Sequence, residues 1–199
     1  MQNKISIALP KGRFLEKCKT LLKDLEIEIG SSKRYSFHIL IDGIDINIKL
    51  LKMVDIPLLF KLGLVDITIL CDEWIKEYEL NCSLIKKLDW CDSRMVLATK
   101  KDFYNFEDIK LATSYPNLAK KYLSTAFKTM HILHISGSVE AMVPEYANAI
   151  FECVETGKTL KDNDLLIRET YMTSSVNLIC KKSFKVEQYP NLLKYLNSI

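Results

Sequence analysis

The sequence predicts an α/β fold with mostly parallel sheets. Apolar runs typical of strands alternate along the chain with amphipathic helical patterns, which is the arrangement of parallel α/β folds. Several of these strands end in short turns that start a helix. Hydrophobic residues make up 48% of the 199 residues, so the chain can bury a core without disulfides.

The individual elements follow from apolar periodicity. Strands are predicted at residues 4–9, 45–50, 65–70, 94–99, 131–135 and 149–154. Helices are predicted at residues 14–25, 56–62, 118–124 and 189–196. Asp42 and Gly43 lie between two apolar runs and predict a hairpin turn, which adds one antiparallel pair.

A basic turn follows the first predicted strand. Lys11 and Arg13 flank Gly12 at the point where the next helix begins. Free N–H groups and the positive end of the helix dipole emerge at such a point, and together they attract polyphosphate. A solvated basic loop is the simpler interpretation of this turn when it is taken alone.

A second turn, rich in acids and hydroxyls, follows the strand at 149–154. Gly157 lets the backbone approach an anion, and the amides of such a turn can point into one concavity. Glu152 and Glu155 can accept hydrogen bonds from ribose hydroxyls and face a developing positive charge. The segment therefore predicts a site for a ribose 5-phosphate. Its predicted phosphate anchor comprises Thr156, Gly157, Lys158, Thr159 and Leu160.

Two alternatives apply to this second turn. Gly157-Lys158-Thr159 also ends the nucleotide-binding pattern G-x-x-x-x-G-K-[ST], but the first glycine of that pattern would fall on Glu152. A carboxylate there would lie beside the phosphates that the loop has to wrap. The other alternative is an ordinary strand, turn and helix start without a ligand.

Four such turns are expected to converge on one cleft. They lie at residues 10–12, 113–117, 136–138 and 155–157. Ligands in open α/β sheets bind outside the carboxyl ends of the strands, which is where these turns are predicted. A composition break at residues 89–93 predicts a crossing between lobes, with a return at residues 171–175.

Together, these stretches resemble the catalytic subunit of ATP phosphoribosyltransferase in its short form, the first enzyme of histidine biosynthesis. The matching segments are, in order, residues 7–13, 55–57 with 63–66, 112–118, 136–140 and 154–160. Five matches in the right order are more specific than any one of them.

The resemblance implies a two-lobed fold like that of type II periplasmic binding proteins, with helices on both faces of the sheets and the active site in the interlobe cleft. Lobe 1 would comprise residues 1–90 and 172–199. Lobe 2 would comprise residues 91–171 and carry the phosphoribosyl-binding turn at 152–160.

The resemblance also implies a reaction. N1 of the adenine of ATP attacks C1 of phosphoribosyl pyrophosphate, and pyrophosphate leaves with Mg2+ that the substrate mainly holds. Glu152 and Glu155 would stabilise the oxocarbenium-like ribose, while Lys11 and Arg13 would stabilise the leaving group. The residues expected to bind ATP or pyrophosphate are Gly12, Arg34, Lys52, Ser136, Gly137 and Ser138.

Short forms of this family work with a separate regulatory subunit that resembles histidyl-tRNA synthetase, so a hetero-oligomer is expected. Two alternatives remain, namely a two-lobed binding module without chemistry and an inactive assembly subunit. The second is kept open by the departures from the family pattern at Thr68, Cys71 and Asn148. In all, the chain departs from that pattern at Lys52, Thr68, Cys71, Asn148 and Glu152. Arginine, two glycines and two aspartates, respectively, are the usual residues there.

Composition excludes several other classes of protein. A net charge of +3 is too small to indicate nucleic-acid binding. No apolar stretch reaches the roughly 18 residues of a membrane span. The six cysteines show no metal or disulfide spacing, and no secretory signal is evident, which predicts reduced thiols and a cytoplasmic location. His131 and His134 would lie on opposite faces of a strand, and residues 76–79 are typical of a solvated helix face.

Overall fold

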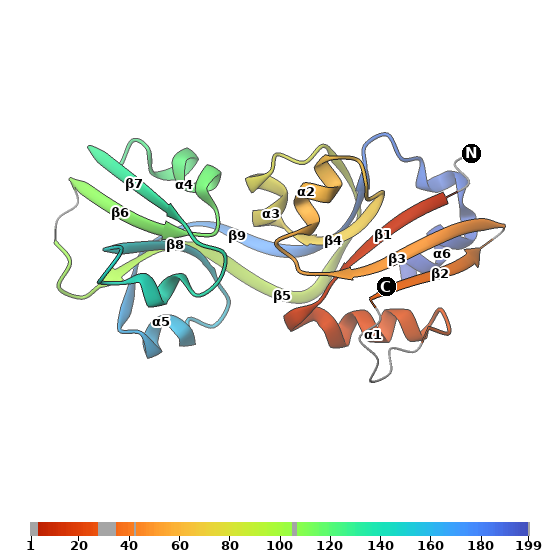
Figure 1. The fold of residues 1–199 in the computed structure, drawn as a ribbon, viewed down its shortest axis with the longest axis horizontal. Helices are drawn as coiled ribbons and strands as arrows, with labels where there is room; N and C mark the ends of the chain where they lie inside the picture. Colours follow the sequence, from red (N-terminus) through yellow and green to blue (C-terminus); the bar gives the residue numbers. More distant parts are fainter. Residues whose placement is uncertain (1–3, 28–34, 42, 105–106, 199) are drawn as a thin grey trace. The chain divides into compact units, whose positions relative to one another are not determined.

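The computed structural model describes residues 4–27, 35–41, 43–104 and 107–198, which form two compact units (Figure 1). Unit 1 comprises the described residues of Met1–Cys71, Tyr78–Leu88 and Val176–Ile199. Unit 2 comprises those of Asp72–Glu77 and Asp89–Ser175. The chain therefore passes from one unit to the other four times.

Unit 1 is built on strands in the order β2-β3-β1-β4-β9. Its own strands are β1 (Lys4–Pro10), β2 (Ser36–Ile41), β3 (Ile44–Leu51) and β4 (Ile67–Cys71). β1 pairs in parallel with β3 and β4, and its side chains are buried on both faces, as expected for a central parallel strand. β2 and β3 form an antiparallel pair, which confirms the predicted hairpin, although Asp42 itself lies outside the described residues.

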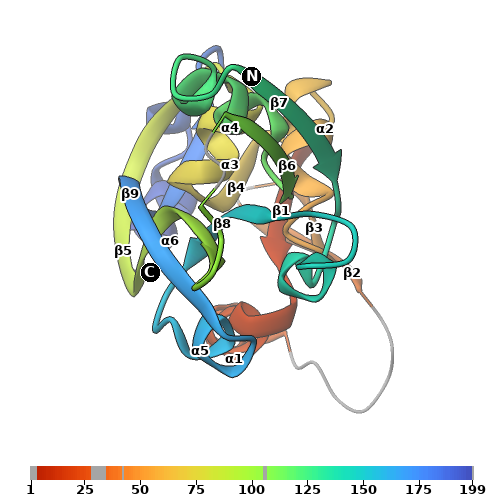
Figure 2. The ribbon, with the colours of Figure 1, turned by 90° about the vertical axis from the view of Figure 1, so that its left-hand side faces the viewer.

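Helices cover both faces of these strands. The 3-10 helix η1 (Gly12–Phe14) leads into α1 (Leu15–Lys23), α2 (Ile56–Lys61) follows β3, and η3 (Val186–Gln188) precedes α6 (Pro190–Ser198). α1 and α2 lie on opposite sides of β1 and β3 (Figures 1 and 2). The Tyr195 hydroxyl of α6 donates a hydrogen bond to the Leu21 carbonyl of α1 at 2.7 Å, so α6 packs beside α1.

Unit 2 is built on strands in the order β9-β5-β8-β6-β7. Its own strands are β6 (Asp108–Thr113), β7 (Thr129–His134) and β8 (Ala149–Val154), and β6 pairs in parallel with both others. Its helices are α3 (Asp72–Glu77), α4 (Pro116–Leu123), η2 (Val139–Met142) and α5 (Lys158–Asp162). α4 and α5 lie on opposite sides of the strands (Figure 1), as predicted. Among the residues described, no helix is long and apolar enough to cross a bilayer.

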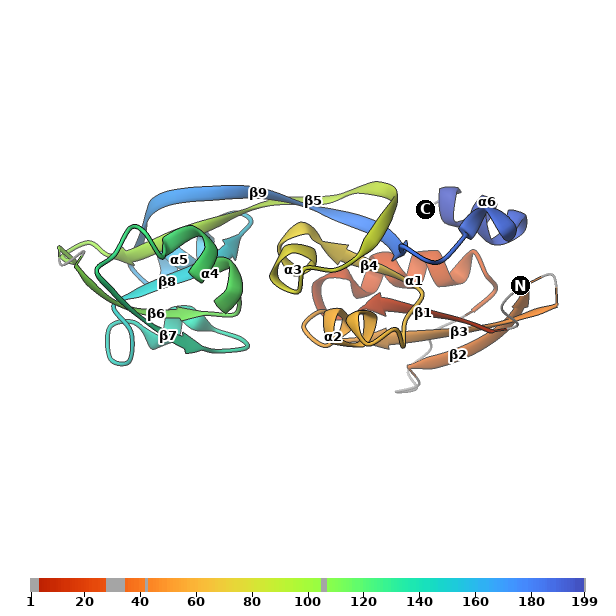
Figure 3. The same cartoon turned by 90° about the horizontal axis from the view of Figure 1, so that it is seen from above.

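Of the two long strands, one was predicted only in part and the other not at all. β5 (Cys82–Lys100) and β9 (Leu165–Lys181) are neighbours in the sheet, and each contributes residues to both units (Figure 3). β5 pairs antiparallel with β8, and β9 pairs antiparallel with β4, so parallel and antiparallel pairs are mixed. The sequence predicted residues 94–99 of β5 and no part of β9. Exposed polar side chains interrupt the apolar pattern in both strands.

Helix α3 groups with unit 2, whereas the predicted lobe 1 included it. The prediction of a solvated helix face at residues 76–79 is wrong for Glu77, which is only 3% exposed. Its two carboxylate oxygens accept hydrogen bonds from the Asn117 and Leu118 N–H groups at 2.9 and 2.8 Å. These N–H groups lie in the first turn of α4, where no intrahelical acceptor exists. Trp74 of α3 also packs on Tyr115, with ring centroids 4.7 Å apart.

Glu77→Ala should lower stability by about 1–2 kcal/mol, the usual effect of removing a helix cap. The two N–H groups at the start of α4 would lose their acceptors in a buried place. Urea unfolding followed by circular dichroism measures the change, with Lys76→Ala, at the exposed neighbouring position, as the matched control. Equal unfolding midpoints for the two variants would contradict this role of Glu77.

Candidate active site

The basic residues predicted in unit 1 lie at one edge of its sheet. β1, β3 and β4 run in parallel, so their carboxyl ends meet at this edge. Lys11 and Arg13 follow β1, Lys52 follows β3, and Cys71 ends β4. The Lys11 N–H donates to the Leu51 carbonyl at 2.7 Å, which fixes the basic turn against the end of β3.

The conformation of this basic turn depends on Gly12. Its φ of +82° lies in the left-handed region, and a Cβ built there would meet no atom within 4 Å. Glycine is therefore needed for its backbone freedom and not for space. The Lys11 ammonium lies 4.4 Å from the centroid of the Tyr35 ring, a cation–π contact. The Arg13 guanidinium lies 3.8 Å from the Cys71 sulfur.

Two departures from the family pattern have a structural explanation in β4. Thr68, where the family usually has glycine, lies inside β4 as the predicted strand at 65–70 implies; it is fully buried, and its hydroxyl donates to the Ala8 carbonyl at 2.8 Å. Cys71 is the last residue of β4 and is also buried. The hydroxyl of Thr68 thus joins two neighbouring strands. Arg34, predicted to bind ATP, lies outside the described residues.

Three of the predicted turns meet at one edge of unit 2. β6, β7 and β8 run in parallel, and the turns at 113–117, 136–138 and 155–157 follow their carboxyl ends. The Thr113 hydroxyl donates to the Phe151 carbonyl at 2.5 Å, which joins β6 to β8. The Ser114 hydroxyl donates to the Ile135 carbonyl at 2.9 Å, which joins β6 to the end of β7.

Glu152 of β8, two residues before the carboxyl end of the strand, has one carboxylate oxygen without a partner among the described residues. Its Oε1 accepts a hydrogen bond from the Cys153 N–H at 3.0 Å, whereas Oε2 is buried and has no hydrogen-bond partner among the described residues. The Ser114 hydroxyl and N–H lie close enough to lower the pKa of Glu152. The hydroxyl proton is donated to the Ile135 carbonyl, and neither group meets the geometry of a hydrogen bond to Oε2. A buried acceptor without a donor is costly, so this oxygen is suited to a ligand that donates.

Burial changes the acidity of Glu152. Loss of solvent raises its pKa from 4.5 to about 7, against the opposing effect of the Cys153 hydrogen bond and of Ser114. The negative charge of Glu140 raises the pKa further. Neither Ser114 nor Glu140 was predicted as a site residue, because only the pairing of the strands brings them to Glu152.

The turn after β8 has a conformation that favours glycine. Gly157 has a φ of +77° and precedes α5, and the Lys158 N–H lies 3.3 Å from the Thr156 hydroxyl oxygen. Thr156, Lys158 and Thr159 are exposed. Leu160 is 2% exposed and packs in the core, so only its backbone is available to a phosphate.

The remaining predicted residues divide between the two ends of the strands. Ser136, Gly137 and Ser138 are exposed at the carboxyl edge, where Gly137 has a φ of +140°. Asn148 lies at the opposite end of β8. There its side-chain oxygen accepts from the Lys110 N–H at 2.9 Å, and its own N–H donates to the Lys110 carbonyl at 3.0 Å. The change from aspartate at 148 therefore does not alter this edge.

The family of the chain is decided by comparison with known proteins. The family model described as HisG, ATP phosphoribosyltransferase, matches residues 52–198. The chain belongs to the ATP phosphoribosyltransferase family. This match leaves out the basic turn at Lys11, but relatives of the family align over nearly the whole chain.

Two relatives illustrate the similarity within the family. The ATP phosphoribosyltransferase of Dictyoglomus thermophilum is 30% identical over 199 residues, covering 98% of this chain and 96% of the relative. That of Clostridium novyi is 32% identical over 194 residues, covering 93% and 92%.

Solved structures support the same fold. The ATP phosphoribosyl transferase (HisG:HisZ) complex from Thermotoga maritima matches with a TM-score of 0.82 and 25% identity, covering 98% of this chain and 97% of that one. The arginine-bound form of ArgBP from T. maritima matches with a TM-score of 0.56 at 13% identity, which shows the fold alone. The predicted fold, like that of type II binding proteins, is confirmed.

The raised pKa of Glu152 makes stability depend on pH. Because the folded state holds this proton up to about pH 7 and the unfolded chain releases it near pH 4.5, stability falls between these values and stays lower above them. Glu152→Gln removes this loss, which is at most roughly 3 kcal/mol. Urea unfolding measures the free energy of unfolding of the variant and the parent at pH 4.5 and at pH 8. The variant minus the parent should be more positive at pH 8 than at pH 4.5. A difference that does not change with pH would contradict this.

Proposed function

We propose that the chain transfers the 5-phosphoribosyl group of phosphoribosyl pyrophosphate to N1 of the adenine of ATP. The products are phosphoribosyl-ATP and pyrophosphate, in the first step of histidine biosynthesis. Membership of the ATP phosphoribosyltransferase family carries this proposal. Unit 2 adds chemical support, because the strand that leads into a glycine turn carries a carboxyl whose buried Oε2 oxygen has no donor among the described residues.

In this reaction Glu152 and Glu155 act on the ribose. As the bond from C1 to the pyrophosphate oxygen breaks, the ring becomes oxocarbenium-like and is stabilised by nearby carboxylates. Ribose hydroxyls would donate to the Glu152 oxygen for which the described part of the chain supplies no donor. Such hydrogen bonds favour the ionised carboxylate, so substrate binding would prepare the charge that the transition state requires.

The turn from Thr156 to Leu160 anchors the 5-phosphate. The positive φ of Gly157 allows the backbone to bend there, and the exposed hydroxyls of Thr156 and Thr159 supply donors. Binding energy from this remote group orients C1 toward the attacking base. The exposed turn from Ser136 to Ser138 offers further donors to a phosphate group.

In this proposal, the basic side chains that bind the phosphate groups come from unit 1. Lys11 and Arg13 would stabilise the negative charge that develops on the leaving pyrophosphate. Gly12, Arg34 and Lys52 would bind the phosphates of ATP or pyrophosphate. Lys52 can do so only as a point charge, because it lacks the planar fork of the arginine usual in the family.

Mg2+ is expected to arrive with the substrate. No group of three or more His, Cys, Asp or Glu side chains that could hold a metal ion exists within the described part of the chain. Mg2+ prefers oxygen ligands, and in many nucleotide-binding sites phosphate oxygens of the substrate coordinate it. The pyrophosphate oxygens would therefore hold the ion, which would neutralise part of the leaving charge.

Similarity to a solved complex supports a regulatory partner subunit for this chain. The T. maritima structure is a HisG:HisZ complex, and this chain covers 97% of the matched subunit. We expect a hetero-oligomer with a subunit resembling histidyl-tRNA synthetase, in which feedback inhibition resides in the partner. All six cysteines are free thiols, which supports a reducing compartment, the cytoplasm.

The direct test mixes the purified chain with ATP, phosphoribosyl pyrophosphate and Mg2+, with and without such a partner. Formation of phosphoribosyl-ATP, separated by chromatography, is the expected result. No product in either mixture, while both substrates bind, would favour the inactive assembly subunit.

Glu155→Gln should lower kcat more than it weakens substrate binding. The neutral amide keeps the shape of the side chain but loses the charge that opposes the oxocarbenium-like ring, an effect of about 10- to 100-fold on kcat. Steady-state kinetics with both substrates measure this. A change confined to KM would show that Glu155 only binds the ground state.

Gly157→Val should abolish binding of phosphoribosyl pyrophosphate. A β-branched residue does not tolerate a φ of +77°, so the turn must take another conformation. Calorimetry measures the affinity, and Gly43→Val, at another glycine of positive φ in the hairpin of unit 1, controls for general strain. Unchanged affinity in Gly157→Val would remove the turn from the proposed site.

A further inference from the structure

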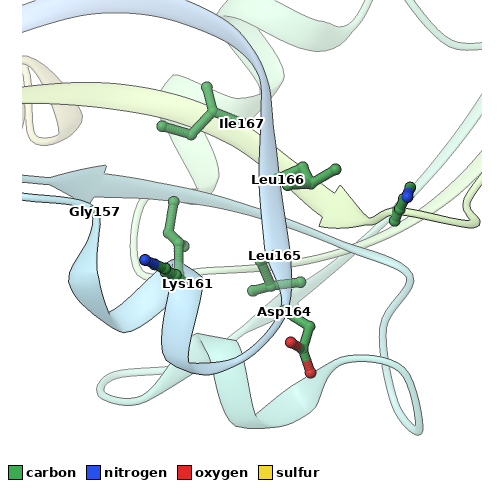
Figure 4. A pocket seen from close by; sticks show the side chains of 8 residues that line it. Gly157, Lys161, Asp164, Leu165, Leu166 and Ile167 are labelled. Atoms are coloured by element: carbon green, nitrogen blue, oxygen red, sulfur yellow. The ribbon is translucent and has the colours of Figure 1, made fainter.

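A pocket of about 440 Å3 lies in unit 2 between helix α5 and the beginning of β9 (Figure 4). Its apolar wall is formed by Leu160, Leu165, Leu166 and Ile167, and Lys101 and Lys161 also line it. A cavity of this size is typical of small-molecule sites, which span roughly 300–1,000 Å3 and are mostly apolar with a few polar groups.

Part of the apolar wall is open to solvent. Leu166 and Ile167 are consecutive in β9 and are 45% and 38% exposed, whereas Leu160 and Leu165 are buried. The strand is exposed from residue 166 to residue 170, so the described elements cover Leu166 and Ile167 only in part. A ligand that covers them gains about 25 cal/mol for each Å2 of apolar surface removed from water.

The charges at the pocket favour an anion. Neither lysine, Lys101 or Lys161, forms a side-chain hydrogen bond or ion pair with the residues that the structure describes. The one acidic residue of the lining, Asp164, lies 3.9 Å from the Lys100 ammonium, which offsets its charge. In Figure 4 the Asp164 carboxylate points away from Leu166 and Ile167.

The size of the pocket favours a small molecule over a protein partner. A stable protein interface buries about 800 Å2 on each side and involves roughly 20–30 residues. Eight residues line this pocket. We propose that the pocket binds a small organic anion with an apolar body, such as a medium-chain or aromatic carboxylate, with its acid group held by Lys161 or Lys101.

This pocket adjoins the turn that the proposed function assigns to the 5-phosphate. Gly157 lines the pocket and precedes α5, and Leu160 of α5 joins the apolar wall to the core. A ligand in the pocket therefore contacts the same turn, and its binding is expected to change the affinity for phosphoribosyl pyrophosphate. This coupling rests on the proposed function, whereas binding of the anion does not.

Binding is tested with 8-anilinonaphthalene-1-sulfonate, an apolar anion whose fluorescence rises in apolar sites. The full chain should bind one equivalent, and octanoate should displace it better than octylammonium of the same chain length. Lys161→Glu and Ile167→Glu should each weaken binding of the probe about tenfold or more, because each places a negative charge at the pocket.

Two variants serve as controls. Lys121→Glu reverses an exposed charge on α4, and Leu84→Glu replaces another exposed leucine, 62% exposed, in unit 1. Both should keep the affinity of the parent within about twofold. Equal binding by parent, Lys161→Glu and Ile167→Glu would overturn the proposal, as would displacement by octylammonium as strong as that by octanoate. Circular dichroism verifies that each variant is folded.

The coupling is tested by calorimetry of phosphoribosyl pyrophosphate with and without saturating octanoate. We expect its Kd to change more than twofold, and octanoate affinity to change by the same factor when the order is reversed. An unchanged Kd would overturn the coupling. If phosphoribosyl pyrophosphate does not bind at all, the proposed function fails, while the fluorescence experiment still decides whether the anion site exists.

Discussion

The structure of the candidate site depends on the alignment of three parallel strand ends in unit 2. The Thr113 and Ser114 hydroxyls bind the Phe151 and Ile135 carbonyls, which fixes the ends of β6, β7 and β8 relative to one another. Within this alignment Glu152 is half-buried, and its Oε2 oxygen is buried without a donor among the described residues. The raised pKa and the suitability for a hydroxyl-bearing sugar are both consequences of that burial.

Unit 1 has a corresponding device in the buried Asp66. One of its oxygens accepts the Ser6 N–H at 2.8 Å, and the other pairs with the Lys181 ammonium at 2.6 Å. The carboxylate thereby links β1, β4 and β9 at the amino end of β4. The Thr68 hydroxyl adds a second link between β4 and β1.

Sequence patterns predicted the elements whose side chains face the core on a regular period. β1 and β8 are buried over most of their length, and β3 alternates buried with more exposed residues, so the apolar patterns of all three were evident. β5 was predicted only in part and β9 not at all, because polar residues in their exposed parts interrupt the apolar pattern and resemble a loop. Glu77 was assigned to solvent because its partners, two N–H groups of α4, lie 40 residues away in sequence.

For the site, the turn motifs predicted the glycines and acids. The conformation of a turn glycine and the chemistry of an acid beside it depend on residues that are neighbours in the sequence. The roles of Ser114, Thr68 and Asn148 were not predictable, because each depends on which strand lies beside it.

The central claim is that hydroxyls of a bound ribose donate hydrogen bonds to the Glu152 carboxyl. Carbon-13 NMR of the labelled carboxyl tests it most directly, by titration of the free chain and of its complexes with ribose 5-phosphate and 2-deoxyribose 5-phosphate. We predict a pKa of about 7 in the free chain, and a lower pKa with the ribose compound than with the deoxy compound. A pKa of 4.5 in the free chain, or the same pKa with both sugars, would contradict it.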